Sequence, residues 1–464
     1  MGTLVKRVFA TTMLAVFMLC ISACGGGEKP NGKITISIGD WPEKGVNPAA
    51  DEAYDRYEKM FAEKRPDVTL VHDSYKFDTQ TFMAKAVAKQ LPDMMTVPYT
   101  EIGKLIDNKL AADITAQMDK FGFMQNMSPS ILDLVTRDGK IYFVPSSTYA
   151  MGIHINKDLF KKAGLTNADG TCKIPETYEE LAETAKIIHE KTGAAGLMMG
   201  TMNGVGGWHF MNVAWSYGAE FIKEEGGKWK AVFNSPECAA ALTYIKDLKW
   251  KYGALGSNDF VDAAEQLKQF AAGNAGMIVF QPVQQKLFTN YGMDKDSVEV
   301  ISMPKGPKGR CSLMGGSVRL INPDTTEEER DAVFDFFEVV GESPKVTDSM
   351  KEAWELSAKQ TVYGGGIVLA SDIFPKWINT DRTKIQEEIF GKYVNVDMAN
   401  YQHYIDFNNV IIKSEYPVCC QELYSVLDGC IQEVLTNQNA VPSELLEGAC
   451  SDFQKNHLDK LEDQ

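Results

Sequence analysis

The sequence predicts an α/β fold, and three observations support this prediction. Short β-prone runs alternate with helix-like segments in the first third of the chain, as in βαβ units built on a mostly parallel sheet. Several later segments begin with clear helix-capping signals. From about residue 345 onward the pattern is almost wholly helical. With 464 residues, the chain is long enough for two or three domains.

The alternation begins after a polar, glycine-rich segment, residues 24–32, which we interpret as a flexible tether. Apolar and β-branched runs then alternate with longer segments of helical periodicity. The expected elements are a strand at 33–39, a helix at 49–64, a strand at 67–72, a helix at 78–89, a strand at 93–97 and a helix at 100–108.

The middle of the chain continues this pattern. A helix is expected to start at Thr177, because Glu180 three residues later completes a capping box. A long helix is expected from Ser235, since Pro236 suits the first helical position. Further strands are expected near 141–144, 151–155, 196–199, 275–280, 298–303 and 315–320, with another capped helix after residue 326.

The N-terminus has the pattern of a secretory signal. Lys6 and Arg7 precede an uncharged run, residues 8–21, which is shorter than the ~20 residues that span a bilayer. The four residues that end at Cys24 are one large branched residue, two small ones and the cysteine, and they resemble the bacterial lipobox. We therefore expect residues 1–23 to be removed. Cys24 would be lipidated and would hold the protein on the extracytoplasmic face of the cell membrane. A buried cysteine in a transmembrane anchor is the alternative.

Composition excludes several classes of function. The formal net charge of −16 argues against nucleic acid as a partner and says little about a neutral ligand. Nine scattered cysteines do not form the framework of a disulfide-stapled domain, although a bridge between Cys430 and Cys450 stays open. No CxxC or HExxH pattern is present. We therefore expect no metal and no cofactor.

From residue 139 onward, several segments resemble the extracellular solute-binding proteins of the maltose-binding type. These proteins are the ligand-capturing subunits of ABC sugar importers. Each segment alone is a common pattern, but together they follow the order found in that family. The segments are residues 139–145, 155–165, 174–181, 233–237, 270–277, 304–307, 315–316 and 441–446.

This resemblance implies two α/β lobes that close around a ligand, joined by three crossings of the chain. Matching positions place the crossings near residues 146–149, 277–280 and 316–320. The first lobe would hold residues 33–146 plus 279–317, and the second 149–277 plus 320–464. A crevice beyond the carboxyl ends of the strands is also where open α/β sheets bind ligands.

A sugar needs flat aromatic rings for its C–H faces and fixed polar groups for its hydroxyls. Residues just past strand ends or at the crossings are therefore the candidates. They are Asp40, Trp41, Tyr99, Thr100, Tyr149, Trp208, Gln281, Gly316, Ser317 and Trp377. Core packing is the alternative for each aromatic residue, and capping is the alternative for Asp40 and Thr100. Trp354 is a second C-terminal aromatic, and Trp215 fits the core better than the site.

One departure from the maltose-binding type bears on specificity. Gln281, Pro282 and Val283 stand where that type carries a stacking tryptophan, so maltose itself is not expected to be the ligand. His154, His209 and Arg319 lie near the crossings. An acidic sugar therefore stays an alternative ligand, because a guanidinium can donate two hydrogen bonds to one carboxylate. Arg319 also fits an ordinary charge between the lobes.

The function that we expect is that of a monomeric, lipid-anchored binding protein without enzymatic activity. It would deliver a carbohydrate, most simply an oligosaccharide, to a membrane permease driven by a cytoplasmic ATPase. An extracellular glycoside hydrolase is one alternative, but it needs two facing carboxylates, and Asp40 is the only acid among the candidates. The other alternative keeps the fold and changes the ligand to a peptide, a polyamine or an acidic sugar.

Overall fold

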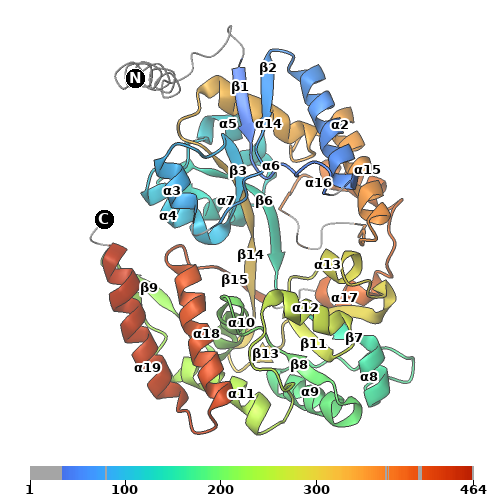
Figure 1. Cartoon of the computed structure of the whole chain (residues 1–464), viewed down its shortest axis with the longest axis vertical. Helices are drawn as coiled ribbons and strands as arrows, with labels where there is room; N and C mark the ends of the chain where they lie inside the picture. The colour runs from blue at the N-terminus through green and yellow to red at the C-terminus, as the bar shows by residue number, and fades with distance from the viewer. Residues whose placement is uncertain are drawn as a thin grey trace, which may run out of the picture.

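The computed structural model describes residues 34–46, 48–78, 81–370, 374, 376–405 and 410–461. These residues form two lobes, the upper and lower halves of Figure 1, each built on a sheet that helices cover. The expected signal, the tether and Cys24 lie outside the described residues. Within the described ranges, no helix combines the length and apolar character needed to cross a membrane.

The first lobe confirms the expected alternation of strands and helices. Strand β1 pairs in parallel with both β2 and β3. Helix α3 is shorter than expected, and the helix expected at 100–108 begins with a 3₁₀ turn at Tyr99–Glu101. The elements up to the first crossing are β1 (Ile34–Ile38), α2 (Pro48–Lys64), β2 (Val68–His72), α3 (Phe82–Val87), β3 (Met94–Pro98), α4 (Ile102–Asp107), α5 (Thr115–Lys120), α6 (Phe123–Asn126), α7 (Pro129–Leu134), β4 (Thr136–Arg137) and β5 (Lys140–Ile141).

The second lobe contains a sheet of strand order β12-β7-β11-β8, in which β7 is antiparallel to both of its neighbours. Its elements are β7 (Gly152–Asn156), α8 (Lys157–Ala163), α9 (Tyr178–Thr192), β8 (Ala195–Met198), α10 (Val205–Tyr217), β9 (Ile222–Glu225), β10 (Lys228–Ala231), α11 (Pro236–Trp250), α12 (Ala263–Ala271), β11 (Ala275–Phe280), α13 (Gln285–Thr289), β12 (Val298–Ser302) and β13 (Lys305–Gly306). The capping box of α9 and the N-cap of α11 at Ser235 are present as expected.

Two long strands join the lobes, as Figure 1 shows. Strand β6 (Phe143–Ala150) carries the chain into the second lobe, and β14 (Gly309–Ile321) brings it back. They pair antiparallel with each other, and β14 also pairs with β3 of the first lobe. The chain enters the second lobe again between Phe390 and Ala399. The remaining elements are α14 (Glu327–Val339), α15 (Asp348–Tyr363), α16 (Thr380–Phe390), α17 (Ala399–Ile405), β15 (Val410–Ser414), α18 (Cys420–Thr436) and α19 (Pro442–Phe453).

Strand pairing divides the chain differently from the expected boundaries. Strand β11 does not cross between the lobes, because it lies inside the second sheet between β7 and β8. Strand β12 pairs with β7, and Cys311 and Leu313 belong to the core of the second lobe, so these residues do not lie in the first lobe as expected. Helices α14 and α15 pack against α2, and Val318, Phe334 and Ala353 belong to the core of the first lobe. The first lobe therefore takes part of the region assigned to the second.

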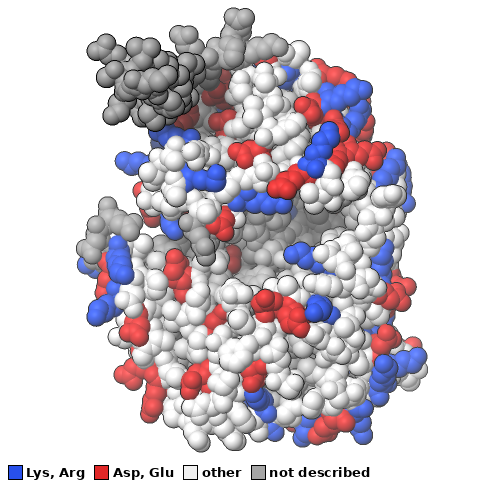
Figure 2. Space-filling view, in the orientation of Figure 1, with Lys and Arg blue, Asp and Glu red and all other residues white. Residues whose placement is uncertain are grey.

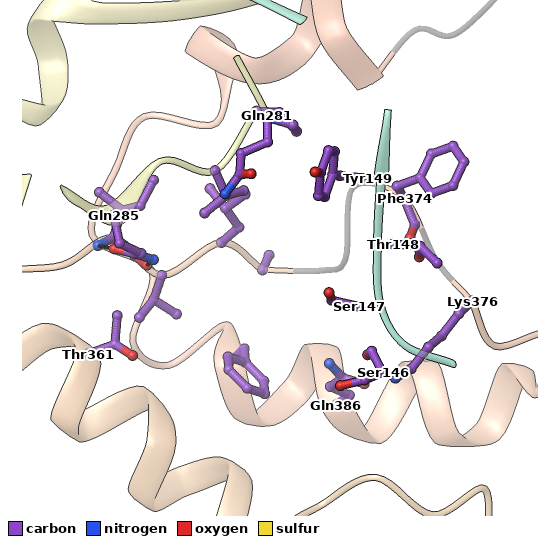
Figure 3. Close-up of a pocket in the computed structure, with 17 residues that line it drawn as sticks. Ser146, Ser147, Thr148, Tyr149, Gln281, Gln285, Thr361, Phe374, Lys376 and Gln386 are labelled. Atoms are coloured by element: carbon purple, nitrogen blue, oxygen red, sulfur yellow. Dashed lines mark hydrogen bonds between the residues drawn. The ribbon is translucent and has the colours of Figure 1, made fainter. Parts of the chain in front are cut away.

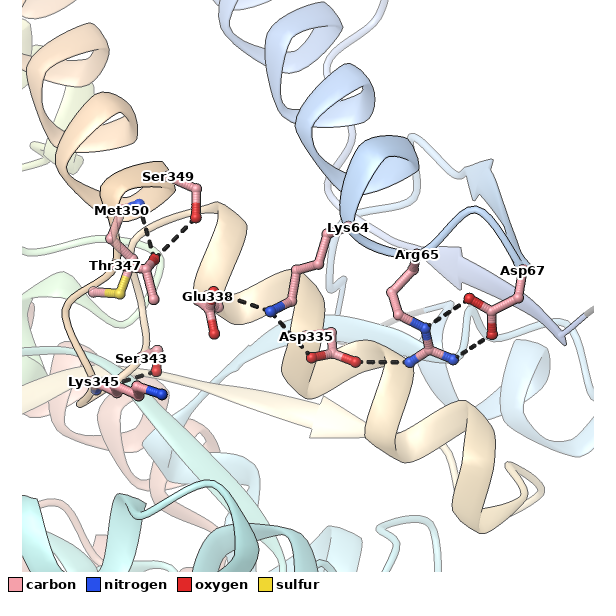
Figure 4. A network of polar contacts seen from close by, with 10 residues as sticks. All are labelled: Lys64, Arg65, Asp67, Asp335, Glu338, Ser343, Lys345, Thr347, Ser349 and Met350. Atoms are coloured by element: carbon pink, nitrogen blue, oxygen red, sulfur yellow. Dashed lines mark hydrogen bonds and ion pairs between the residues drawn. The ribbon is translucent and has the colours of Figure 1, made fainter.

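An ionic network fastens α14 to α2 (Figure 4). Arg65 contacts Asp67 at 2.8 Å and Asp335 at 2.7 Å, and Lys64 contacts Glu338 at 3.0 Å. These side chains are partly exposed, so each pair contributes at most about 1 kcal/mol. The buried contact of Phe61 with Phe336, at 5.6 Å between ring centroids, contributes more to the attachment.

The C-terminal region is less uniform than expected. Helices predominate there, but Val410–Ser414 form β15, which pairs in parallel with the beginning of β14. This short apolar run becomes a strand because it lies beside an open strand edge, which local periodicity does not reveal. Cys430 and Cys450 are free thiols in the structure, and both are buried.

Candidate ligand-binding cleft

A cavity of about 450 Å³ lies where the two lobes meet. Figure 2 shows the surface hollowed between the two halves, with uncharged side chains inside the hollow and charged ones on its rim. The end of β6, the segment after β11, the loop after α15 and one face of α16 form the wall. The lining residues are Ser146, Ser147, Thr148, Tyr149, Gln281, Pro282, Val283, Gln285, Thr361, Ile367, Val368, Leu369, Ala370, Phe374, Lys376, Gln386 and Phe390.

The crossing strands position the hydroxyl groups of this wall. Gly316 of β14 lies opposite Thr148 of β6, and Ser317 lies opposite Ser147. The φ angle of Gly316 is +146°, and a Cβ atom there would lie 2.1 Å from the carbonyl oxygen of Ser147, so this position requires glycine. The hydroxyls of Ser147 and Ser317 are hydrogen-bonded at 2.8 Å. The predicted residues Gly316 and Ser317 therefore support the wall from behind.

Two glutamines extend the wall from the second lobe. Gln281 follows β11 directly, as expected, and Gln285 begins α13. The side-chain amide of Gln285 donates to the carbonyl of Ile367 at 2.7 Å and accepts from its N–H at 2.8 Å. These two bonds hold the loop after α15 against the start of α13, and Figure 3 shows Gln285 and Gln281 from close by.

Aromatic rings lie on several sides of the cavity. Tyr149 lines it, and the edge of Trp208 meets Tyr149 with 6.4 Å between ring centroids. Trp208 is half-buried and also packs against Phe280, at 5.8 Å. Phe374 and Phe390 complete the aromatic lining. Burial raises the pKa of Tyr149, with Glu415 nearby adding to the effect, so its hydroxyl stays protonated and can donate.

Among the described residues, Lys376 is the cation that reaches the wall. Lys376 comes from the segment before α16, and its Nζ donates to the carbonyl oxygen of Pro145 at 3.0 Å and to that of Ser146. Figure 3 shows it beside Ser146 and Gln386 at one end of the cavity, away from Gln285 and Thr361. Nothing in the sequence pattern pointed to Lys376 beyond its place next to Trp377.

The comparisons with known proteins identify the family. The model of the bacterial extracellular solute-binding proteins matches residues 39–343. The chain belongs to this family.

Relatives of this solute-binding protein are distant. The diacetylchitobiose binding protein DasA of Streptomyces coelicolor is 24% identical over 327 residues, which are 67% of this chain and 73% of the relative. The polygalacturonan/rhamnogalacturonan-binding protein YtcQ of Bacillus subtilis is 26% identical over 352 residues, or 69% and 66% of the two chains. Maltose-bound MalE3 of T. maritima superposes with a TM-score of 0.66 at 20% identity, covering 91% of this chain and 99% of that one. This likeness shows that the fold is shared.

Several predicted site residues of this solute-binding protein lie outside the cavity wall. Trp41 is 7% exposed and stacks on His72, with 4.0 Å between ring centroids, in the core of the first lobe. Trp377 is buried under the guanidinium of Arg382, 4.5 Å from its ring centre, and Trp354 lies on the same guanidinium at 4.9 Å. The structure thus brings these three tryptophans into the interior.

The polar candidates after β1 and β3 have structural partners. Asp40 has a φ of +59° and accepts a hydrogen bond from the N–H of Thr96 at 2.7 Å. Thr100 is buried and accepts from the amide of Gln421 at 3.2 Å, which joins the two lobes. Tyr99 is also buried, and its hydroxyl has no hydrogen-bond partner among the described residues. None of the three lines the cavity.

Three basic residues, His154, His209 and Arg319, suggested an acidic ligand, but they do not supply a charge to the cavity. Burial lowers the pKa of His154 to about 4 and that of His209 to about 3, so both rings are neutral at pH 7. Arg319 donates through Nε to Glu342 at 3.1 Å. Within the described ranges, no three His, Cys, Asp or Glu side chains are grouped so that they could hold a metal ion.

Proposed function

We propose that this protein captures a carbohydrate between its two lobes and delivers it to the permease of an ABC importer. The observation that carries the proposal is the chemistry of the interlobe cavity. Its wall combines hydroxyl groups, side-chain amides and aromatic rings, which suit sugar hydroxyls and C–H faces. Membership of the solute-binding family and the sugar ligands named for DasA and YtcQ support it.

The lobes would close because a ligand held by both of them favours the closed state. Tyr149 on the crossing strand, Gln281 of the second lobe and Gln386 of the first would contact the same ligand from different sides. Closure of this kind presents a single loaded shape to the permease, whose cytoplasmic ATPase drives uptake. The protein would act as a monomer, since one chain carries the whole cavity.

Titration calorimetry against a panel of neutral and acidic oligosaccharides tests the proposal, with small-angle X-ray scattering on the same samples. We expect one class of oligosaccharide to bind and the radius of gyration to fall on binding. Absence of binding to every carbohydrate in the panel would refute the sugar ligand. Peptides and polyamines serve as the comparison set, because the same fold could close around them.

Cys24 and the preceding residues motivate a second part of the proposal, that a lipid on this cysteine anchors the protein to the outer face of the cell membrane. Residues 1–23 would be the signal that is removed, and 24–32 the tether. Labelling of growing cells with a palmitate analogue, followed by membrane fractionation, tests it. The Cys24→Ala variant should lose both label and membrane association, and equal labelling of both forms would contradict the anchor.

A further inference from the structure

Two strands from different lobes end close together at the crossing. Strand β3 of the first lobe runs antiparallel to β14, and its last residue, Pro98, lies opposite Ser317. Strand β15, which follows α17 of the second lobe, runs parallel to β14, and its last residue, Ser414, lies opposite Met314. Since β6 pairs with the other edge of β14, the two strands run towards each other along one edge, with two residues of β14 between their ends.

An acidic residue follows each of these strand ends. Glu101 lies in the 3₁₀ turn after β3 and is 7% exposed. Glu415 follows β15 directly and is half-buried, and the hydroxyl of Tyr424 donates to its Oε1 at 2.7 Å. The strand register therefore brings one carboxyl group from each lobe to the place where the lobes meet.

The two lobes are in direct contact around these acids. Gln421 of α18 donates through its side-chain amide to Oγ1 of Thr100 at 3.2 Å. A Cβ atom on Gly103 of α4 would lie 2.2 Å from the carbonyl oxygen of Pro417, so the backbones of the two lobes touch here. Residues of both lobes, Glu101 among them, line a second cavity of about 520 Å³ at this contact. Figure 1 shows α4 directly above the end of α18.

The surroundings of Glu101 make its ionisation costly. Burial above all, together with the negative charge of Glu422 on α18, raises the pKa of Glu101. The positive charge of Lys104 and the hydrogen bond from Thr100 act in the opposite direction without cancelling this effect. The neighbour across the lobe boundary is thus another acid, and the cation comes from the same helix as Glu101.

Glu415 is also held in an unfavourable place for a charge. Burial raises its pKa to about 7, the hydrogen bond from Tyr424 opposes this shift, and the negative charge of Glu101 adds to it. Burial raises the pKa of the other nearby hydroxyls and thiols, so they stay protonated; these are Tyr99, Tyr149, Cys419 and Cys420. The remaining titratable groups around the second cavity are Asp107, Lys228, His457 and Lys460.

We propose that Glu101 and Glu415 make this contact between the lobes sensitive to pH. The contact holds while Glu415 is protonated. Once both carboxylates are charged they repel each other in a partly buried place, and separation of the lobes at this point lets water reach them. Protonation would then set the resting arrangement of the lobes, on which ligand capture depends. That consequence rests on the proposed function, whereas the contact itself does not.

Proton linkage gives the direction and the size of the effect. Once exposed to water, Glu415 would regain its ordinary pKa of 4.5, so the separated arrangement binds fewer protons than the joined one. Separation is therefore favoured as pH rises through about 7. Between pH 5.5 and pH 8 the ratio of separated to joined molecules should rise by up to about 30-fold.

Distances between spin labels on the two lobes test the proposal in the absence of any ligand. The non-natural amino acid p-acetylphenylalanine, placed at Val87 of α3 and Ser451 of α19, would carry the labels and leave the cysteines unmodified. Both positions are exposed. Double electron–electron resonance then measures the populations of short and long distances at a series of pH values. We expect the longer distance to gain population above pH 7, and identical distributions throughout would overturn the proposal.

Substitution of each acid localises the effect. Glu415→Gln should keep the shorter distance at every pH, because the amide still accepts from Tyr424 and does not ionise. Glu101→Gln should reduce the change with pH, because it removes the charge that acts on Glu415. Glu63→Gln, at an exposed position of α2, is the control and should respond as the native protein does. A native response in either of the first two variants overturns the role of the pair.

The test remains decisive if a variant is unstable. Thermal unfolding at pH 5.5 shows whether each variant folds, and if Glu415→Gln does not, the native pH series and Glu101→Gln give the answer. Because no ligand is present, a constant distance in this experiment leaves the carbohydrate proposal standing. Absence of binding to any carbohydrate, in turn, refutes the proposed function and leaves the pH-sensitive contact standing.

Discussion

At the scale of single residues, Trp41 and Trp208 have different environments, although both were predicted to contact the ligand. Trp41 stacks on His72, meets Tyr54 edge-on at 4.8 Å and contributes to the core of the first lobe. Trp208 is half-buried, and its ring contacts Tyr149 in the cavity wall. The difference follows from the neighbours of each ring: Trp41 packs within the core of the first lobe, and Trp208 packs against Tyr149, which lines the cavity.

Truncating these two rings should therefore separate stability from binding. Trp41→Ala should lower the free energy of unfolding by about 3 to 5 kcal/mol, as for other buried aromatic residues, and leave ligand affinity unchanged. Trp208→Ala should weaken ligand binding more than it lowers stability, because Tyr149 loses its packing partner. Urea unfolding and calorimetry on both variants measure this. Equal affinity losses would contradict the distinction.

A half-buried acid provides a second prediction at this scale. Burial raises the pKa of Glu415 from 4.5 to about 7, even though Tyr424 donates to its Oε1 at 2.7 Å. Between pH 4.5 and 7 the folded protein therefore binds more protons at this site than the unfolded chain does. Its contribution to stability is present at low pH and is lost as pH rises through this window.

Glu415→Gln should remove that loss. The variant should gain up to about 3 kcal/mol over the native protein between pH 4.5 and pH 8, at about 1.4 kcal/mol per pKa unit. Urea unfolding at a series of pH values measures the difference. Glu447→Gln supplies the control for removing one carboxylate, because Glu447 is exposed. Parallel profiles for Glu415→Gln and the native protein would show that the site does not titrate in this range.

At the scale of elements, the packing of α10 against α18 positions Trp208. Asp428 of α18 accepts hydrogen bonds from the N–H groups of Gly204 at 2.6 Å and Gly207 at 2.8 Å. A carboxylate at a helix N-terminus satisfies donors that have no partner within the helix. Gly207 allows the close approach, since a Cβ atom there would lie 2.4 Å from the carbonyl oxygen of Tyr424.

Two glycine-to-alanine changes on this helix pair should have opposite effects. Gly207→Ala should destabilise the protein by about 1 to 3 kcal/mol, because the added methyl group forces α10 away from α18. Gly429 lies at an exposed position of α18, where an added methyl group meets no atom within 4 Å, so Gly429→Ala should stabilise the protein by about 0.5 to 1 kcal/mol. Thermal unfolding of both variants tests the packing, and a neutral Gly207→Ala would contradict the close approach.

At the scale of the whole molecule, the lobes communicate through β6 and β14. The pairing of these strands shifts register between Ser317 and Val318. Gly316 lies next to this shift, and its backbone conformation is one that residues with a side chain rarely adopt. Ser147 and Tyr149 lie on the same stretch of β6 and face the cavity. Geometry at the crossing and geometry at the ligand site are therefore coupled.

Gly316→Ala should consequently affect both properties. The methyl group would push β6 from β14, lowering stability by more than the roughly 1 to 2 kcal/mol that a left-handed backbone alone costs, and weakening ligand affinity. Gly273→Ala is the matched control, because its φ is +76° but no atom lies within 4 Å. Gly273→Ala should lower stability and leave ligand affinity unchanged. Calorimetry and thermal unfolding compare the two variants. Unchanged ligand affinity in Gly316→Ala would show that the geometry of the crossing is not coupled to the ligand site.

Sequence reasoning anticipated the site unevenly. Tyr149 and Gln281 line the cavity as expected, and both were predicted from positions that match the family's crossing segments. Phe374, Lys376, Gln386 and Phe390 were missed, since they come from a helical region whose fold over the cavity depends on distant partners. Trp41 and Thr100 also follow strand ends, but the core and the other lobe cover them.

Local sequence patterns encode the alternation of strands and helices, the capped helix starts and the family resemblance, because periodicity and capping are properties of neighbouring residues. The tertiary structure decided which lobe holds β12 and α14, that 410–414 form a strand, and that Lys376 faces the cavity. Those outcomes depend on which edge or surface a segment meets after folding. Pairing partners far apart along the chain provide that surface, and no local pattern encodes it.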